Sequence, residues 1–282
     1  MRFYNKKKID QRTPDQIKEH YEIEKELARR LKTASAQERR LLYTSLYNEL
    51  FRRVKHHPQL RIKQSPQLTQ QAVRHKLNLI ARFLPKTKTF MEIGPGDCAL
   101  ALKMAELGQS VYAVDVSDEI TKEIIQPKNF KLYISDGSSI PVSSNTIDIA
   151  YSNQLMEHLH PDDAYRQLRN IYAALNVTGK YICITPNRYC GPSDISKYFD
   201  NIATGLHLKE YTLGELSNLF KEVGFSKVML YAGGRGSYIR FPLQLGRLCE
   251  IILSKFPLKI AKTIACCFPL KAILGINIIG VK

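Results

Sequence analysis

The chain has 282 residues, 44% of them hydrophobic, and a formal net charge of +16 at pH 7. This composition is typical of a globular protein and excludes collagen-like, low-complexity and largely disordered chains. Its six cysteines form no C-x-x-C pair, which argues against a zinc ribbon or a disulfide-stapled domain. The basic start is not followed by an apolar stretch, so we expect no signal peptide and a cytoplasmic location.

The charge is distributed unevenly along the chain. Residues 1–88 have 22 Lys and Arg against 8 Asp and Glu, residues 89–179 have 6 against 12, and residues 180–282 have 14 against 6. Basic flanks around an acidic middle favour an anionic partner such as a membrane surface, a nucleic acid or a phosphorylated substrate. A well-solvated helical surface gives the same pattern, and both interpretations stay open here.

The first part of the chain is predicted to be helical. Apolar residues recur at helical spacing over residues 15–55, and a further helix is expected over residues 65–84, with Pro85 ending it. We expect residues 1–85 to form a basic helical extension of the main domain.

From residue 89 on, short apolar segments alternate with helical ones. Strands are predicted at residues 89–93, 110–114, 129–134, 146–151 and 180–185, and helices at residues 99–107 and 162–175. This alternation is typical of βαβ units, and strands that are apolar on both faces need helices on both sides of the sheet. We therefore predict an α/β fold with a doubly wound, mostly parallel sheet over residues 86–239.

A glycine-rich turn follows the first predicted strand. It contains Gly94 and Gly96, and Asp115 follows Gly94 by 21 residues at the end of the second strand. Glycines allow the backbone to turn tightly and approach a ligand, and a carboxylate at this strand end can accept hydrogen bonds from ribose hydroxyls. Residues 94–99 also fit the G-x-G-x-x-[GA] pattern of dinucleotide sites, and an ordinary strand-to-helix turn fits them too.

Three features favour a sulfonium cofactor over a dinucleotide. Glu92, inside the first strand, would repel a pyrophosphate but would suit a cationic amino-acid moiety. Asp136 and Gly137 end the third strand, where an adenine amino group could donate a hydrogen bond. The acidic middle of the chain tolerates a sulfonium better than a diphosphate.

Five motifs then occur in order. They are MEIGPGD (residues 91–97), YAVDVS (112–117), ISDGSSIPVSSNTIDIAYSNQLMEHLHPDD (134–163), LNVTGKYICITPN (175–187) and LKEYTLGELSNLFKEVGF (208–225). Over roughly residues 89–230 the chain resembles class I S-adenosylmethionine-dependent methyltransferases, in particular the small-molecule group called type 11. The resemblance implies a seven-stranded, Rossmann-like methyltransferase fold and S-adenosyl-L-methionine as the cofactor.

The resemblance also implies roles for individual residues. Gly94 and Gly96 would pass beneath the methionine part of the cofactor, with Glu92 ordering their loop. Asn153, after the fourth strand, would lie near the methyl donor, and Asp115 would bind the ribose hydroxyls.

The adenine would be held by the segments that follow the second and third strands. By the same resemblance, Val116 would lie against the adenine ring. Asp136 would accept the adenine amino group, and Gly137 would add a backbone contact.

Methyl transfer from a sulfonium is an in-line displacement, so positioning supplies most of the rate. A base is needed only where the acceptor loses a proton in the step. The candidates are Glu157, His158 and His160, which follow the fourth strand, because a histidine can act as a base near neutral pH, and Glu157 and His158 are taken as the catalytic pair. A role in shaping the loop and capping the next helix stays open as the alternative.

We expect no metal in this segment. The matching segment of ubiquinone-pathway O-methyltransferases carries two glutamates and a histidine proposed as metal ligands. Here Glu157 and His158 remain but Gln154 stands at the first glutamate, and the loss of an anionic ligand weakens a site for a hard cation.

The resemblance implies two further strands, at residues 227–231 and 275–281. The second of these, within residues 274–282, is expected to be inserted antiparallel at the sheet edge. Between them, residues 240–273 are predicted to form a basic amphipathic helical insertion, with Arg247, Lys255, Lys259 and Lys262 among apolar residues. Pro269 and the marginal length argue against a transmembrane helix. The insertion fits a cover over the acceptor pocket or a contact with an anionic membrane, and nucleic acid is not favoured because no known RNA module accompanies the charge.

The sequence therefore predicts an S-adenosylmethionine-dependent methyltransferase. Its acceptor is expected to be a small molecule or lipid-like, methylated at oxygen or carbon rather than on nucleic acid, because the Asn/Asp-Pro-Pro-Tyr loop of amino methyltransferases is missing after the fourth strand. Two alternatives stay open at this point: a nicotinamide-dependent oxidoreductase on a Rossmann fold, and a non-catalytic module that binds S-adenosylmethionine.

Overall fold

The structure is a computed structural model that describes residues 12–58, 60, 66–84, 88–118, 121 and 124–282. The expected start and end of the third helix, at Ser65 and Pro85, lie outside the described residues.

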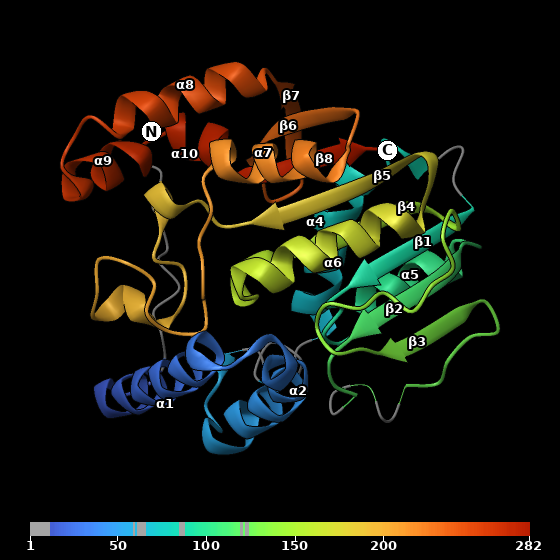
Figure 1. The fold of residues 1–282 in the computed structure, drawn as a ribbon, viewed down its shortest axis with the longest axis horizontal. Coiled ribbons are helices and arrows are strands. Elements are labelled where there is room, and N and C mark those ends of the chain that lie inside the picture. The colour runs from blue at the N-terminus through green and yellow to red at the C-terminus, as the bar shows by residue number, and fades with distance from the viewer. Residues whose placement is uncertain (1–11, 59, 61–65, 85–87, 119–120, 122–123) are drawn as a thin grey trace.

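The N-terminal part begins with two helices, as predicted. Helix α1 spans Pro14–Thr33 and α2 spans Ala36–Arg53. Each begins at a capping box, in which Thr13 or Ser35 accepts a hydrogen bond from the backbone three residues on. Helix α4 (Pro66–Ile80) follows. Figure 1 shows α1 and α2 side by side at one end of the molecule.

The core is an eight-stranded sheet in the order β3-β2-β1-β4-β5-β8-β6-β7. Its strands are β1 (Thr89–Ile93), β2 (Ser110–Asp115), β3 (Phe130–Ile134), β4 (Ile147–Asn153), β5 (Leu175–Thr185), β6 (Lys227–Gly234), β7 (Ser237–Phe241) and β8 (Ile276–Val281). Strands β1 to β5 are parallel, and β8 runs antiparallel between β5 and β6. The prediction of a doubly wound, mostly parallel α/β sheet is confirmed.

Two details of the sheet differ from the sequence prediction. The last strand lies between β5 and β6 rather than at the sheet edge. The edge belongs to an eighth strand, β7, which pairs antiparallel with β6. Arg235 and Gly236, which link the two strands, both have positive φ angles, of 52° and 89°. A two-residue turn of this kind matches the twist of a hairpin and returns the chain along β6.

Helices cover both faces of the sheet. Leu79 of α4 and Met104 of α5 (Ala99–Glu106) pack with Phe90 and Ile149 on one face. On the other face, helices α6 (Pro161–Ala174) and α7 (Leu213–Val223) share a core with residues of α1 and α2. This arrangement leaves the carboxyl ends of β1 to β4 facing the N-terminal helices (Figure 1).

The predicted insertion contains three short helices, α8 (Leu243–Leu253), α9 (Leu258–Ala265) and α10 (Leu270–Leu274). They lie at the end of the molecule opposite α1 and α2 (Figure 1). No helix in the described part of the chain is long and apolar enough to cross a membrane. Three 3-10 turns, at Met156–His158, Arg188–Cys190 and Ile195–Tyr198, lie in the connections that follow β4 and β5.

Candidate active site

A cavity of about 160 Å³ lies at the carboxyl ends of β1 to β4. Open α/β sheets bind their ligands at this edge. The sheet side of the cavity is lined by the turns after these strands: Gly94, Gly96, Asp115, Val116, Ser117, Ser135, Gly137, Gln154, Leu155 and His158. The opposite wall comes from the N-terminal part: Glu24, Tyr43, Tyr47, Leu50, Phe51 and His57.

The glycine turn is preformed for a ligand. Gly94 and Gly96 have φ angles of +65° and +62°, a region that other residues rarely adopt. A side chain at Gly94 would come within 3.1 Å of Leu155 Cδ1, whereas no described atom lies within 4 Å of a Cβ built on Gly96. The backbone at Gly96 therefore faces open space, as close approach of a ligand requires.

Asp115 is fixed beside this turn. Its Oδ2 accepts a hydrogen bond from the Gly96 backbone N–H (3.2 Å), and its Oδ1 accepts one from Val116 N–H (2.7 Å). The carboxylate also lines the cavity. A carboxylate accepts hydrogen bonds only, which is the chemistry that ribose hydroxyls require of a partner. The open glycine turn and this carboxylate fit the nucleoside of S-adenosylmethionine.

Glu92 lies beneath the turn and not on the cavity wall that the described residues form. It is 2% exposed, and its Oε1 lies 3.5 Å from Nζ of Lys76 on α4. Burial raises the pKa of Glu92 to about 7, although Lys76 opposes the shift. Oε2 has no hydrogen-bond partner among the described residues. Its position suits a role in ordering the turn.

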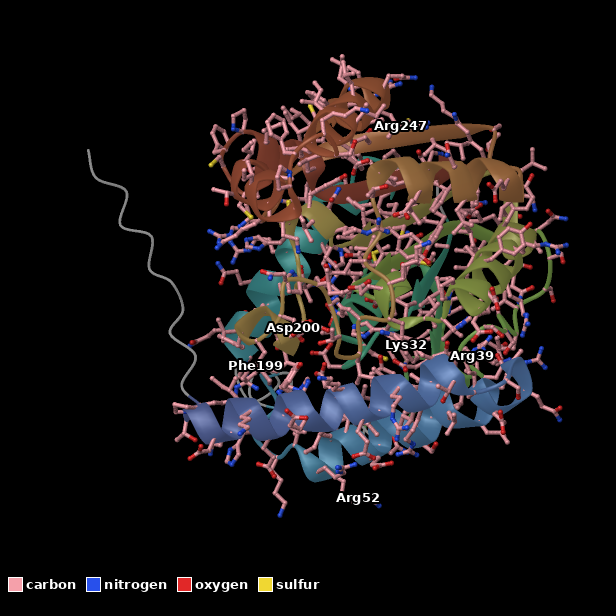
Figure 2. The ribbon with its side chains drawn as sticks, turned by 60° about the vertical axis from the view of Figure 1, so that its left-hand side comes forward. Lys32, Arg39, Arg52, Phe199, Asp200 and Arg247 are labelled. Carbon is pink, nitrogen blue, oxygen red and sulfur yellow. The ribbon has the colours of Figure 1, made fainter. Side chains whose placement is uncertain are left out.

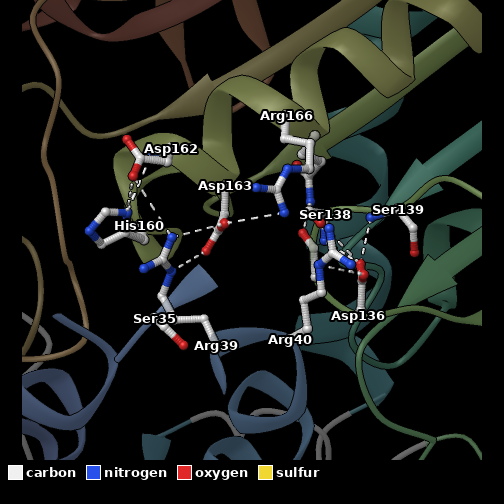
Figure 3. A network of polar contacts seen from close by, with 12 residues as sticks. Ser35, Arg39, Arg40, Asp136, Ser138, Ser139, His160, Asp162, Asp163 and Arg166 are labelled. Carbon is white, nitrogen blue, oxygen red and sulfur yellow. Dashed lines mark hydrogen bonds and ion pairs between the residues drawn. The ribbon is translucent and has the colours of Figure 1, made fainter. Parts of the chain in front are cut away.

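Asp136 holds its own loop (Figure 3). Its Oδ1 accepts hydrogen bonds from the backbone N–H groups of Ser138 (2.9 Å) and Ser139 (2.7 Å), and Oδ2 lies 3.5 Å from Arg40 Nε of α2. Burial raises the pKa of Asp136, but the Ser138 and Ser139 hydrogen bonds outweigh it, so the pKa is lowered. Gly137 lines the cavity, while the Asp136 side chain is outside the lining that the structure describes.

The turn after β4 presents Gln154 and His158 rather than Asn153 to the cavity, as far as the described residues show. Gln154 has a positive φ of 57°, and its N–H donates to Ile184 O, which fixes the turn at the end of β4. Asn153, expected near the methyl donor, is therefore not among the described residues that line the cavity, and Gln154, for which the sequence indicates no cofactor contact, is.

His158 is held with its ring nitrogens in different roles. Nδ1 lies 3.0 Å from Leu206 O, a carbonyl that can only accept, so Nδ1 carries the proton and Nε2 carries a lone pair. Burial and the neighbouring His207 lower the pKa of His158 to about 3. The imidazole is therefore neutral at pH 7 with a lone pair on Nε2, and so low a pKa makes it a weak base in this environment.

Glu157 lies behind His158 and is fully buried. Its Oε2 accepts a hydrogen bond from Thr185 Oγ1 (2.8 Å), and Oε1 lies 4.0 Å from His207 Nε2. Burial raises the pKa of Glu157 to about 7, with His207 opposing. The ring centroids of His207 and His158 lie 4.7 Å apart. Glu157 is not among the described residues that line the cavity, so it can affect a ligand there through these two histidines.

The N-terminal wall of the cavity is bonded directly to the core. Arg39 forms a buried ion pair with Asp163 of α6 (Figure 3). Tyr43 Oη donates to the same carboxylate at 3.0 Å. Thr44 Oγ1 donates to Val116 O at 2.6 Å. The sequence predicts these helices but carries no signal for their position over the cavity, because the contacts join residues more than 70 positions apart.

A second link joins α1 to the segment after β5. Leu206 N–H donates to Glu24 Oε2 at 3.0 Å, and the Phe199 ring stacks on Tyr21 at 4.3 Å. Tyr21 Oη also donates to Asp200 Oδ2 (2.7 Å). Figure 2 shows Phe199 and Asp200 against α1.

Two clusters of described residues have three potential metal-ligating atoms within 4.8 Å of one another: His20, Glu24 and His57, and Glu157, His158 and His207. In the first cluster, Arg12 Nη1 lies 2.6 Å from His20 Nδ1, so Nε2 carries the proton that bonds Glu24 (2.7 Å). In the second cluster, His207 offers a potential ligand atom that the segment after the fourth strand does not indicate. That no metal is bound stays a prediction.

The fold and the cavity define a doubly wound α/β protein that binds a nucleoside-containing cofactor at the carboxyl ends of its strands. Residues 67–230, more than half of the chain, match the family model described as a methyltransferase domain. The chain belongs to this family: it is an S-adenosylmethionine-dependent methyltransferase, and S-adenosylmethionine is its cofactor. The predictions of class and cofactor are confirmed, and a nicotinamide-dependent oxidoreductase is not favoured.

Solved structures share the fold at low sequence identity. A SAM-dependent methyltransferase from Archaeoglobus fulgidus is 17% identical with a TM-score of 0.50, over 75% of this chain and 93% of that one. A SAM-dependent methyltransferase from Thermotoga maritima, described as a possible histamine N-methyltransferase, is 14% identical with a TM-score of 0.50, over 76% and 91%. No curated protein matches the sequence. These likenesses extend to the fold alone.

Proposed function

We propose that the chain methylates a small-molecule or lipid-like acceptor, at oxygen or carbon, in the cytoplasm or at a membrane surface. The observation that carries the proposal is that the glycine turn, Asp115 and His158 line one cavity whose opposite wall is largely apolar and aromatic. Tyr43, Tyr47, Leu50 and Phe51 supply most of that wall, beside Glu24 and His57, and this apolar part suits an apolar acceptor.

The cofactor contacts follow from the cavity lining. Gly94 and Gly96 would lie against the methionine part, Asp115 would bind the ribose, and Val116 with Gly137 would hold the adenine. Glu92 and Asp136 would act indirectly, by ordering the glycine turn and the loop of residues 136–139. Gln154 would take the place near the methyl donor that the sequence suggested for Asn153. When bound, S-adenosylmethionine supplies an electrophilic methyl group.

The parts of the chain would have different roles. Residues 86–239 with the last strand, residues 274–282, would form the catalytic core. Residues 1–85 would close the cofactor cavity, since α1 and α2 contribute one of its walls. Residues 240–273 would serve as the contact with a membrane rather than as a direct cover, because they do not line the cavity formed by the described residues.

Calorimetric titration with S-adenosylhomocysteine, run beside NADH, tests the cofactor site. We expect binding of the first compound only. Asp115→Ala should weaken it by about 1–3 kcal/mol, because the ribose hydroxyls lose their acceptor in a closed site. Asp118, three residues after Asp115, carries an exposed carboxylate and serves as the control. Asp118→Ala should leave binding unchanged. Equal affinity of the folded Asp115→Ala protein would contradict the assignment.

His158 is proposed as the proton acceptor where the acceptor loses a proton. His158→Asn retains an N–H donor for Leu206 O but has no ring lone pair, so we expect turnover to fall, by less than the about 10²–10⁴-fold typical of a base whose pKa lies near the working pH. The measurement is transfer of labelled methyl groups from S-adenosylmethionine to a lipid extract and to a polar extract. Affinity for S-adenosylhomocysteine should be unchanged. Full turnover by the variant would leave His158 with a loop-shaping role.

A further inference from the structure

Helices α8 and α9 expose a run of large apolar side chains. Six residues are between 44% and 57% exposed and form the surface called here the apolar face: Leu245, Leu248, Ile251, Ile252, Phe256 and Ile260. Phe268, after α9, is 88% exposed. Single exposed apolar residues are ordinary, but a contiguous group marks an interaction surface.

The fold itself does not need this face. Helix α8 packs on the protein through Leu243, Gly246 and Leu253, which are buried. A Cβ on Gly246 would come within 2.9 Å of Leu213 Cδ1 and Leu230 Cδ2, so the helix is seated closely on α7 and β6. A surface helix normally presents polar residues on its other side. Here the other side is apolar as well.

The charges around the apolar face are basic. Lys255 and Lys259, which lie between Ile252 and Ile260 in the sequence, are exposed, and so is Lys271 on α10, a helix that contacts both α8 and α9. Glu250 is the only acidic residue in residues 223–282, and it is buried. Its carboxylate accepts hydrogen bonds from Asn187 Nδ2 and from the backbone of Leu213, so it neutralises nothing on the surface.

We propose that α8 and α9 dock the protein on the surface of an anionic lipid bilayer. The apolar face would enter the interface while the three lysines meet the lipid phosphates, a combination that binds amphipathic helices to membranes. A second copy of the chain is a poorer occupant, because a two-fold contact would place the same lysines opposite one another, and residues 223–282 offer no exposed acidic side chain to pair them. The helices are too short to span the bilayer and would lie on it.

Lys262 is not part of this contact, although the sequence places it in the same basic pattern. Its Nζ donates to Gly191 O (2.7 Å) and Asn201 O, so it ties α9 to the segment after β5. Farther along, that segment reaches Leu206 on the cavity wall.

Co-sedimentation of the full chain with vesicles tests the docking. Vesicles of phosphatidylcholine alone and with phosphatidylglycerol are compared over a series of salt concentrations. We expect binding to the anionic vesicles that declines as salt is raised, and little binding to the neutral ones. A variant with Lys255→Gln, Lys259→Gln and Lys271→Gln should bind at least about tenfold more weakly. A charge-matched control, with Lys18→Gln, Lys32→Gln and Lys128→Gln, should bind like the original chain.

The apolar face is tested by Leu248→Ser, Ile252→Ser and Phe256→Ser together. Because these side chains are half exposed, the melting temperature should be kept while vesicle binding is lost. Leu41→Ser, Ile125→Ser and Val177→Ser, at other exposed apolar positions, are the control. Equal partition onto both vesicle types, binding to neither, or equal loss in the control would overturn the proposal. So would a dimer in sedimentation equilibrium that the apolar variant alone dissociates.

Discussion

Replacing Arg39 with Leu is expected to lower the free energy of unfolding by about 3–5 kcal/mol. Arg39 and Asp163 have side chains that are 5% and 1% exposed, and Arg39 Nη2 also bonds Asp163 Oδ1 at 3.2 Å. Removing the guanidinium leaves the buried Asp163 carboxylate with the Tyr43 hydroxyl as a hydrogen-bond donor at 3.0 Å and with Arg166 Nη1 more distant, at 3.9 Å. The loss is measured by urea denaturation monitored by circular dichroism.

The neighbouring Arg40 provides the matched control. Its side chain is 48% exposed, and its Nε lies 3.5 Å from Asp136 Oδ2. Water therefore screens this ion pair. Arg40→Leu should cost less than about 1 kcal/mol. Arg39→Leu should also weaken S-adenosylhomocysteine binding, since α2 supplies part of the cavity wall. A similar small loss in both variants would show that the buried pair does not hold the N-terminal helices on the core.

The parallel part of the sheet could be predicted because its strands are short, apolar and separated by helical patterns. Strand β7 could not. Its residues are exposed or only partly buried at the sheet edge, and polar and apolar residues are mixed along it, so they give no apolar run. Its turn, Arg235-Gly236, lacks the usual Asn-Gly or Asp-Gly signal. The pairing of the last strand between β5 and β6 likewise depends on contacts far apart in the chain.

The candidate site divides in the same way. Gly94, Gly96 and Asp115 could be found because a tight turn and a strand-end carboxylate leave a local pattern. The wall formed by α1 and α2 could not, since nothing within a helix specifies which distant surface it covers. Gln154 was missed because its position depends on the positive φ of one residue, which the sequence does not reveal for a glutamine.

His207 was missed for another reason. It lies 50 residues after Glu157, yet its Nδ1 bonds Glu210 Oε1 at 2.9 Å and its Nε2 faces Glu157. Hydrogen bonding to Glu210 and the charge of Glu157 outweigh desolvation, the largest single effect, and raise the pKa of His207. The buried groups behind His158 are thus assembled from two connections, and neither segment alone indicates them.

Glu157→Gln is expected to change how stability depends on pH. Burial raises the pKa of Glu157 to about 7 in the folded protein, from an ordinary value of 4.5. Between these values the folded state holds a proton that the unfolded state has released, so the free energy of unfolding falls as pH rises, by up to about 3 kcal/mol. A glutamine at this position has no proton to lose, and its oxygen can still accept from Thr185.

The variant should therefore match the original chain near pH 4.5 and exceed it by up to about 3 kcal/mol at pH 8, as measured by urea unfolding at both pH values. Glu92→Gln should show the same sign, because burial raises the pKa of Glu92 to about 7 as well. Glu222→Gln, at an exposed position of α7, should show no such difference. A constant offset between Glu157→Gln and the original chain at both pH values would mean that Glu157 is ionised in the folded state throughout, and that its charge is stabilised by His207 more strongly than burial opposes it.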